Sequence, residues 1–391
     1  MEKTPHYSYK LGNLPKGCRL CVKGSKLVLF VTGICSAKCY FCPISDKKYG
    51  KDVVYADEWP IKNDKELLEE ARLIEAEGAG ITGGDPLARL DRTVRHIKLL
   101  KKKFGRKFHI HLYTPLVLVD DKNLKKLYNA GLDEIRFHPN LDDGKLWNRI
   151  GLAKKLKWKV GVEIPVIPGK EKETKVLIGF ISDKVDFLNL NELEVSDNKV
   201  SKLSERGFKT KDELSYGVKG SEEMALRLLK YCKIKNVHYC TATLKDKVQL
   251  GNRIKRRAKN VAKSFDIINK DGTLTRGVIY LSNLKPSFNY KSILDKTNKN
   301  KSLRIKIIKQ LKIIKNNLKK EFKIKDIEVD DKNLRLITSI DAVEMIKDRV
   351  NKEIFRNCLK DKKILGLKDI YLAIVTEYPT YDGIILDLEF L

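Results

Sequence analysis

The chain of 391 residues lacks any long hydrophobic run. A helix needs about 20 consecutive apolar residues to cross a bilayer, and the longest apolar runs, such as residues 27–31, are only as long as a strand. We therefore expect no membrane span. The first residues are polar and lack the roughly 7–15-residue apolar core of a secretory signal peptide, so we expect a cytoplasmic protein.

Acidic residues are too few to balance the basic ones. The sequence has 80 lysine and arginine residues against 51 aspartate and glutamate residues, which gives a formal net charge of +29 at pH 7. Thermophilic proteins also carry many charges, but of both signs. An excess of one sign instead favours a polyanionic partner, nucleic acid above all.

Only eight cysteines are present, and three of them lie close together. Cys35, Cys39 and Cys42 form the pattern Cys-x3-Cys-x2-Cys, with Phe41 directly before the third cysteine. Without a signal peptide, grouped cysteines indicate metal binding or catalysis rather than disulfides. Three thiolates can hold three irons of a [4Fe–4S] cluster and leave the fourth iron open. Zinc is the alternative, but a structural zinc site normally has a fourth ligand.

Short apolar runs alternate with amphipathic helical segments between residues 26 and 242. We expect strands at residues 26–31, 78–82, 108–114, 134–138, 159–166, 187–192 and 237–241, and helices at 63–77, 90–103, 121–130, 147–157, 172–184 and 221–230. Such alternation predicts βαβ units and a parallel sheet. About seven strands fit a whole or partial α/β barrel, whose active site lies at the C-terminal ends of its strands. The cysteine run directly follows the first strand.

The cysteine pattern resembles the signature of the radical S-adenosylmethionine (SAM) superfamily. The run Gly83-Gly84-Asp85-Pro86 after the second strand is similar to the Gly-Gly-Glu-Pro type motif of that family. The resemblance implies a partial (β/α)6 barrel, a [4Fe–4S] cluster on Cys35, Cys39 and Cys42, and SAM bound to the open iron. It also implies reductive cleavage of SAM to a 5′-deoxyadenosyl radical, which abstracts a hydrogen atom from the substrate. An electron donor such as ferredoxin or flavodoxin is then expected.

The resemblance, together with positions at strand ends, gives a candidate cofactor site. Its members are Phe41, Gly83, Gly84, Asp85, Pro86, Tyr113, Thr114, Glu163 and Pro165. Aspartate is shorter than the glutamate of the family motif, so we expect the backbone of this run to contribute more than the side chain of Asp85. Glu163 and Pro165 resemble the strand that supports the adenine in the family, although a strand that leads into a proline turn explains them equally simply.

Polar residues at two further strand ends are candidate substrate contacts. Asn189, Asn191 and Glu192 end the sixth predicted strand and are expected at the barrel mouth. His138 ends the fourth strand, and a lone histidine there is as often structural as functional.

The remaining cysteines suggest a second metal site. Cys18 and Cys21 form a Cys-x2-Cys pair before the first strand, and Cys240 ends the last strand. Together they would suit zinc or a second iron–sulfur cluster. A redox pair and ordinary buried thiols are the alternatives. Cys232 and Cys358 are expected in the core.

Four segments follow from these patterns: an N-terminal extension (residues 1–25), the barrel (26–243), a basic helical bridge (244–263) and a smaller α+β domain (264–391), which we expect to bind substrate. In the last segment we expect a hairpin at 265–281, a lysine-rich linker at 291–301 and an amphipathic helix at 303–322. A strand at 334–337, a helix at 342–355 and a closing pair at 369–376 and 383–390 follow.

The favoured function is a radical SAM enzyme that modifies a large anionic substrate, RNA and most naturally tRNA, because of the net charge and the basic stretch at residues 245–263. The alternative is an activating enzyme or a modifier of a protein or small molecule, since the chain also resembles archaeal proteins related to pyruvate formate-lyase activating enzymes. A non-catalytic iron–sulfur or nucleic-acid-binding protein is disfavoured because the cysteine triplet has no fourth ligand nearby.

Overall fold

The computed structural model describes residues 1–351 and 370–391. Cys358, residue 369 and the end of the helix predicted at 342–355 lie outside the described residues. The chain divides into two compact units, residues 1–256 and 257–391. Helix α7 (Gly251–Val261) contributes residues to both units.

The first unit contains an eleven-stranded sheet with a parallel centre. Its parallel strands are β3 (Lys26–Phe30), β6 (Gly78–Thr82), β7 (His109–Thr114), β8 (Glu134–Phe137), β9 (Lys159–Val166), β10 (Phe187–Glu192) and β11 (Val237–Cys240). Short antiparallel strands extend both edges: β4 (Tyr55–Ala56) and β5 (Trp59–Pro60) beside β3, and β2 (Tyr9–Leu11) and β1 (Glu2–Lys3) beside β11. The predicted partial α/β barrel is confirmed, with β11 as one parallel strand more than the resemblance implied.

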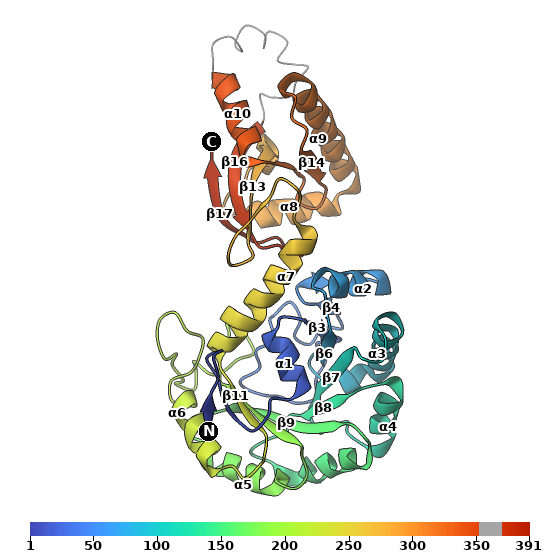
Figure 1. Ribbon diagram of the computed structural model, residues 1–391, viewed down its shortest axis with the longest axis vertical. Coiled ribbons are helices and arrows are strands. Elements are labelled where there is room, and N and C mark those ends of the chain that lie inside the picture. Colours follow the sequence, from blue (N-terminus) through green and yellow to red (C-terminus); the bar gives the residue numbers. More distant parts are fainter. Residues whose placement is uncertain (352–369) are drawn as a thin grey trace. The chain divides into compact units, whose positions relative to one another are not determined.

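Helices follow the strands and cover the outer side of the sheet (Figure 1). They are α2 (Asp64–Leu73), α3 (Leu90–Phe104), α4 (Asp121–Ala130), α5 (Glu171–Ile181) and α6 (Ser221–Tyr231). The first unit also contains the helical segments η1 (Pro86–Arg89), η2 (Gly144–Lys155) and η3 (Leu244–Leu250). Side-chain caps start α2 and α4, where Asn63 accepts from the Glu66 amide and Asp120 from the Asn123 amide. Gly131 ends α4 in the left-handed conformation, with φ 103°.

Alternation along the strands separates an apolar outer face from a polar inner one. On β7, Ile110 and Leu112 belong to the main hydrophobic core, whereas His109 and His111, which alternate with them, are buried polar residues. On β8, Ile135 and Phe137 likewise lie in the core, and the residues that alternate with them are charged. Because successive side chains of a strand point to opposite faces, the inside of the barrel is lined by polar groups.

Residues 1–25 are part of the first unit. They supply β1 and β2 to the sheet, and the helix α1 (Lys16–Val22) lies on the inner side of the barrel (Figure 1). Leu20 and Cys18 of α1 are buried. The segment is therefore packed into the barrel as well as preceding it in sequence.

The second unit is a mixed α+β unit around an antiparallel sheet in the order β14-β15-β13-β16-β17. Its strands are β12 (Ile267–Ile268), which pairs with β13 (Leu274–Leu281), then β14 (Ile327–Asp330), β15 (Arg335–Thr338), β16 (Ile370–Glu377) and β17 (Ile385–Phe390). Its helical segments are η4 (Ser282–Leu284), α8 (Tyr290–Lys299), α9 (Lys301–Phe322) and α10 (Ile340–Asn351). The predicted hairpin, amphipathic helix and closing strand pair are present.

One prediction for this unit is wrong. The lysine-rich segment at residues 291–301 was expected to be a linker, but it forms most of helix α8. Leu294 and Thr297, three residues apart, are buried on one side of this helix, while most of its lysines are exposed. A single buried stripe is enough to hold a helix whose composition is otherwise that of a loop.

No helix among residues 1–351 and 370–391 is long and apolar enough to cross a membrane, as the sequence predicted.

Candidate active site

A cavity of about 420 Å³ lies at the C-terminal ends of the parallel strands. It is lined by the three cysteines of the triplet and by residues in or directly after the C-terminal halves of β6, β7, β9 and β10, together with His138 after β8. Of the predicted cofactor residues, the lining includes Phe41, Gly83, Gly84, Tyr113, Thr114, Glu163 and Pro165, and of the predicted substrate residues it includes Asn191 and Glu192. One cavity thus brings together most of the residues chosen from the sequence.

The three cysteine thiols face this cavity from the loop after β3. Burial raises the pKa of the Cys39 thiol to about 11, and the neighbouring Cys35 and Cys42 thiols add to the rise. The three sulfur atoms are therefore close enough to influence one another. Their positions fit a cluster whose irons each take one thiolate.

The described residues contain no group of three or more histidine, cysteine, aspartate or glutamate side chains placed to hold a single metal ion.

Gly83 and Gly84 allow the loop after β6 to lie directly against the cysteine loop. The Gly84 amide donates to the Thr32 carbonyl at 2.7 Å, and the Asp85 amide donates to the Ile34 carbonyl at 2.8 Å. A Cβ atom on Gly84 would meet the Ile34 oxygen at 2.5 Å and the Cys35 Cβ at 2.8 Å. Only a residue without a side chain permits this contact, so the two-glycine run helps to shape the cysteine loop.

Asp85 and Pro86 are buried behind the cavity and are not among its lining residues. The Asp85 Oδ1 atom accepts from the Leu87 amide at 3.0 Å and from the Thr114 hydroxyl at 2.8 Å. Burial raises the pKa of this carboxyl group. The Asp85 side chain thus caps η1 and fixes the end of β7.

Glu163 presents a firmly held carboxylate to the cavity. Its Oε1 atom accepts from Asn191 at 2.9 Å, and its Oε2 atom accepts from Asn189 and from Arg136, each at 2.8 Å. Burial alone would raise the pKa of Glu163, but Arg136 and the two asparagine amides lower it. Asn189 is buried and holds Glu163 from behind, without lining the cavity.

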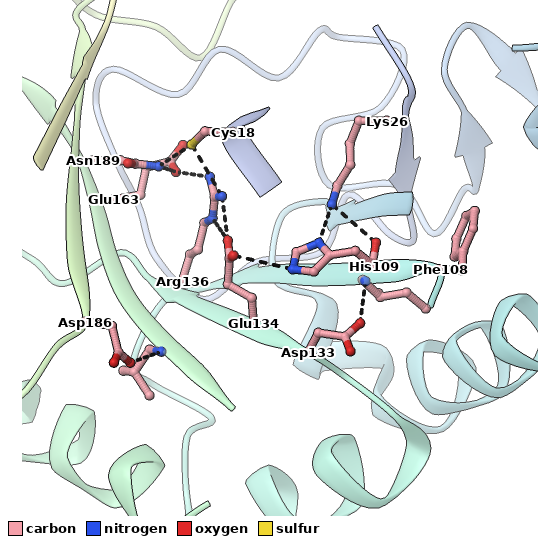
Figure 2. A network of polar contacts seen from close by, with 12 residues as sticks. Cys18, Lys26, Phe108, His109, Asp133, Glu134, Arg136, Glu163, Asp186 and Asn189 are labelled. Atoms are coloured by element: carbon pink, nitrogen blue, oxygen red, sulfur yellow. Dashed lines mark hydrogen bonds and ion pairs between the residues drawn. The ribbon is translucent and has the colours of Figure 1, made fainter. Parts of the chain in front are cut away.

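Arg136 is the centre of a buried polar network below the cavity (Figure 2). It forms ion pairs with Glu134 at 2.5 Å and with Glu163 at 2.8 Å. The network continues from Glu134 to His109 and from His109 to Lys26. Sequence reasoning missed this network, although the alternation of Glu134 and Arg136 with apolar residues along β8 was its signal.

Helix α1 closes this network on the inner side of the barrel. A Cβ atom on Gly17 would collide with Arg136, His111 and Glu134. The Cys18 sulfur lies 3.5 Å from an Arg136 nitrogen and 3.3 Å from the Asn189 amide nitrogen. Burial raises the pKa of Cys18 to about 12. Cys18 is therefore a neutral thiol that packs against Arg136 and Asn189, the two residues that bond the Glu163 carboxylate.

The predicted second metal site gains no support from this arrangement. Cys18, Cys21 and Cys240 influence one another electrostatically, so they lie in the same region. None of the described residues, these three included, forms a group placed to hold a metal ion. The second site stays a prediction.

The segment between β10 and α6, residues 193–220, packs against the cysteine loop. The side-chain amide of Asn198 donates to the Cys42 carbonyl at 3.1 Å, and the backbone amide of Lys202 donates to the Tyr40 carbonyl at 2.6 Å. Arg206 lies 4.0 Å from the centre of the Tyr40 ring. Leu203 belongs to a small apolar cluster with Tyr40 and Phe41. We call residues 193–220 the clamp segment. No helix or strand periodicity in the sequence predicts it.

Two ion pairs at the cavity rim were also not predicted from the sequence. Lys245 Nζ lies 2.6 Å from Glu194, and Lys211 Nζ lies 2.9 Å from Glu192. Glu192 also accepts from the Ala242 amide at 2.7 Å. Lys245 is the only lysine or arginine that lines the cavity within the described part of the chain, and Glu194 neutralises it.

The comparisons with known proteins agree with this geometry. A family model described as the radical SAM superfamily matches residues 29–181. A protein of Methanocaldococcus jannaschii is 47% identical over 280 residues, which cover 69% of this chain and 74% of that protein. The chain belongs to the radical SAM superfamily. The Methanocaldococcus relative carries the provisional name of a glycyl-radical enzyme activating enzyme.

Solved structures of radical SAM enzymes also match the chain. Methylornithine synthase is 17% identical with a TM-score of 0.38, and the match covers 53% of this chain and 62% of that one. A radical SAM methyltransferase of Kitasatospora setae, solved with tryptophan and a SAM analogue, is 10% identical with a TM-score of 0.34, covering 50% and 41%. The same enzyme with cobalamin and a [4Fe–4S] cluster has a TM-score of 0.33. The chain therefore spans less than two thirds of each of these structures.

Membership of the superfamily confirms the predicted cofactors, a [4Fe–4S] cluster and SAM, and the prediction that the chain is an enzyme. The cysteine triplet and the glycine run beside it fit the cluster, because both line one cavity and the triplet has no fourth cysteine there. Which residues contact SAM and substrate is not shown by the comparisons, so the contacts chosen from the sequence stay proposals.

Proposed function

We propose that this radical SAM enzyme acts on a protein, as an activating enzyme that generates a radical on a polypeptide. The 47% identity to a relative named as a glycyl-radical enzyme activating enzyme is the observation that carries the proposal. The predicted preference for RNA modification has no counterpart in the names of the relatives described above.

The charges around the cavity also favour a protein over RNA. Three carboxylates line it, those of Glu163, Glu192 and Glu194. Lys245, the one lysine or arginine among the described lining residues, is already paired with Glu194. A phosphodiester would find no unpaired cation there, whereas a neutral backbone segment such as one containing glycine meets no electrostatic barrier.

In the proposed site, Cys35, Cys39 and Cys42 hold the cluster, and the Gly83–Gly84 run keeps the cysteine loop in place. When bound, the cluster and SAM supply an electron and a radical that abstracts hydrogen. Glu163 is held ionised by Arg136, so it accepts hydrogen bonds from hydroxyl or ammonium groups of a bound molecule. An apolar part of the cavity wall is formed by Phe41, Pro165 and Tyr113, and it excludes water from the reacting atoms.

Isotope transfer distinguishes the two substrate classes. The loaded enzyme is incubated under anaerobic reducing conditions with SAM and with host protein or host RNA, each deuterated in a separate experiment. We expect deuterium in the 5′-deoxyadenosine product only with protein labelled at glycine. Deuterium from RNA, and none from protein, would instead support the RNA-modifying alternative.

Cys39→Ala tests the cluster assignment itself. Removal of one of three iron ligands should abolish the iron–sulfur absorbance near about 400 nm together with reductive SAM cleavage. Cys232→Ala is the matched control, because Cys232 packs at the edge of the hydrophobic core away from the cavity. A Cys39→Ala protein that keeps its iron and its SAM cleavage would refute the assignment.

A further inference from the structure

The second unit contains a groove of about 670 Å³ between helix α9 and strand β14. Lys312, Lys315 and Lys319 of α9 and Lys325 after it line one side, and Ile327 and Val329 of β14 line the other. All of these residues belong to the same compact unit, and none of them belongs to the cavity that holds the cysteine triplet.

The helical wall of the groove carries unbalanced positive charge. Helix α9 contains eight basic residues and one acidic residue, Glu321. The spacing of Lys312, Lys315 and Lys319 places them on one face, where like charges repel one another. In the part of the chain that the structure describes, none of the four groove lysines forms an ion pair. The wall therefore offers binding energy to a negatively charged ligand.

The opposite wall is the edge of a sheet. β14 pairs with β15 on one side, with Val329 opposite Leu336, and it is the first strand in the sheet order. Among the described strands, none pairs with its outer side. A free strand edge presents a row of unpaired amide and carbonyl groups, to which an extended chain can add. Val329 is half-buried and lies on the groove side, so the edge also offers apolar contact.

We propose that this groove binds an extended acidic segment of a partner polypeptide, which adds a strand to β14 and places carboxylates against the α9 lysines. Backbone pairing supplies affinity in this mode, and alternate side chains supply specificity. The groove itself follows from α9 and β14 alone. That its occupant belongs to the enzyme's substrate protein rests on the proposed function.

A polypeptide suits the groove better than a nucleic acid does. Asp326 and Glu328 also line it, and Glu328 is paired with Lys263 at 2.8 Å. A phosphodiester chain has a charge at every residue, so it would place some of its charges next to these carboxylates. A peptide can place a neutral or basic residue at the same positions. Its backbone also matches the strand edge, which a nucleic acid does not.

Selection from a random decapeptide library against the full-length protein tests the proposal. We expect the bound sequences to be enriched in aspartate and glutamate that alternate with β-branched residues. The tightest of them is then synthesised with a fluorescent label for measurements of Kd. A second version has N-methyl groups on alternate residues, which removes the amides needed for strand addition. An oligouridylate of equal charge is the third probe.

Two triple variants, each of which removes three positive charges from α9, test whether the peptide binds in the groove. Lys312→Gln, Lys315→Gln and Lys319→Gln together should weaken peptide binding at least tenfold. The matched control is Lys306→Gln, Lys309→Gln and Lys320→Gln, which alters exposed lysines of the same helix that do not line the groove. This control should change Kd less than threefold. Circular dichroism of both variants verifies that α9 is retained.

Four outcomes would overturn the proposal. The first two are selected peptides without acidic enrichment and no selected peptides at all. The others are an oligouridylate that binds more tightly than the peptide and an N-methylated peptide that binds equally well. These results are separate from the test of function, which measures hydrogen transfer. If peptide binding is found but no protein-derived deuterium enters 5′-deoxyadenosine, the proposed function fails and the groove assignment stands.

Discussion

At the residue scale, Gly84 shows how one missing side chain shapes the candidate active site. Its backbone lies against Ile34 and Cys35 of the cysteine loop, at distances that leave no space for a Cβ atom. The sequence pointed to this run through its resemblance to a family motif. The structure adds a physical reason: the glycines let two loops pair through backbone hydrogen bonds at the mouth of the barrel.

We predict that Gly84→Ala lowers the iron content of the reconstituted protein by more than half. The new methyl group must push the cysteine loop away, and such overpacking costs about 1–3 kcal/mol. Iron analysis and thermal unfolding of the purified variant measure both effects. Gly179→Ala in α5 is the control, because a Cβ atom there meets nothing within 4 Å. Equal iron content in Gly84→Ala and wild type would contradict the proposed role of the glycine.

Glu134 gives a prediction for the dependence of stability on pH. Burial alone would raise its pKa, but Arg136 and the neighbouring cations lower it from 4.5 to about 2. A carboxylate with a lowered pKa stabilises the folded state above its unfolded pKa, and this contribution is lost as the pH falls through the folded value. The shift corresponds to roughly 3 kcal/mol. We therefore expect the free energy of unfolding to decrease by an amount of this order between pH 5 and about pH 2.

Denaturant titrations across this pH range measure the effect. The Glu134→Gln variant should be less stable than wild type at pH 7, because the buried Arg136 then keeps a single carboxylate partner. Its stability should also vary less with pH in the acid range. If the variant and the wild type lost stability in parallel, the acid sensitivity would come from other groups.

At the element scale, the clamp segment holds the cysteine loop in place, and no sequence motif predicted this role. Residues 193–220 contribute only isolated bridges to the sheet structure, but they hold the backbone of Tyr40 and Cys42 and cover the Tyr40 ring. Helix and strand periodicity do not detect such a segment, because its function depends on contacts between residues about 150 positions apart.

We predict that Asn198→Ala combined with Arg206→Ala increases the rate of iron loss to a chelator at least fivefold. The two side chains restrain the loop that carries the proposed cluster ligands, and without them this loop should open more often. Leu214→Ala is the control from the same segment, since Leu214 is 96% exposed. An unchanged rate of iron loss in the double variant would show that the clamp segment does not restrain the loop.

The element scale also shows where sequence patterns succeed and fail. The seven parallel strands and the helices between them were predictable, because each combines a buried apolar stripe with a turn or cap. Helix α8 was not, since its lysine content hid the two buried positions that hold it. The polar inner face was equally hidden, because its cause is the pairing of Arg136 with residues of other strands.

At the scale of the whole molecule, the two units have separate hydrophobic cores. The described core residues of the barrel come from residues 1–256, and those of the second unit come from residues 257–391. Separate cores are the usual sign that parts of a chain can fold independently. The excess of positive charge is not confined to one of them, although residues 285–325 are especially lysine-rich.

We predict that a fragment of residues 1–263, which keeps α7 complete, folds and binds its cluster without the second unit. Its iron content and its basal reductive SAM cleavage should be within twofold of the full chain. It should not bind the acidic peptide, because the groove between α9 and β14 is removed. A fragment that is insoluble or lacks iron would show that the barrel depends on the second unit.

The sequence by itself determined the superfamily, the cofactors and the order of strands and helices. These depend on residue types at short spacings: the cysteine triplet, the glycine run and the alternation of apolar segments. Only the tertiary structure decided which candidate residues share a cavity, that Glu163 is supported by Arg136 while Asp85 is buried behind the wall, and that α9 and β14 enclose a groove. The physical reason is that these arrangements depend on contacts between residues distant in the chain, which no local pattern encodes.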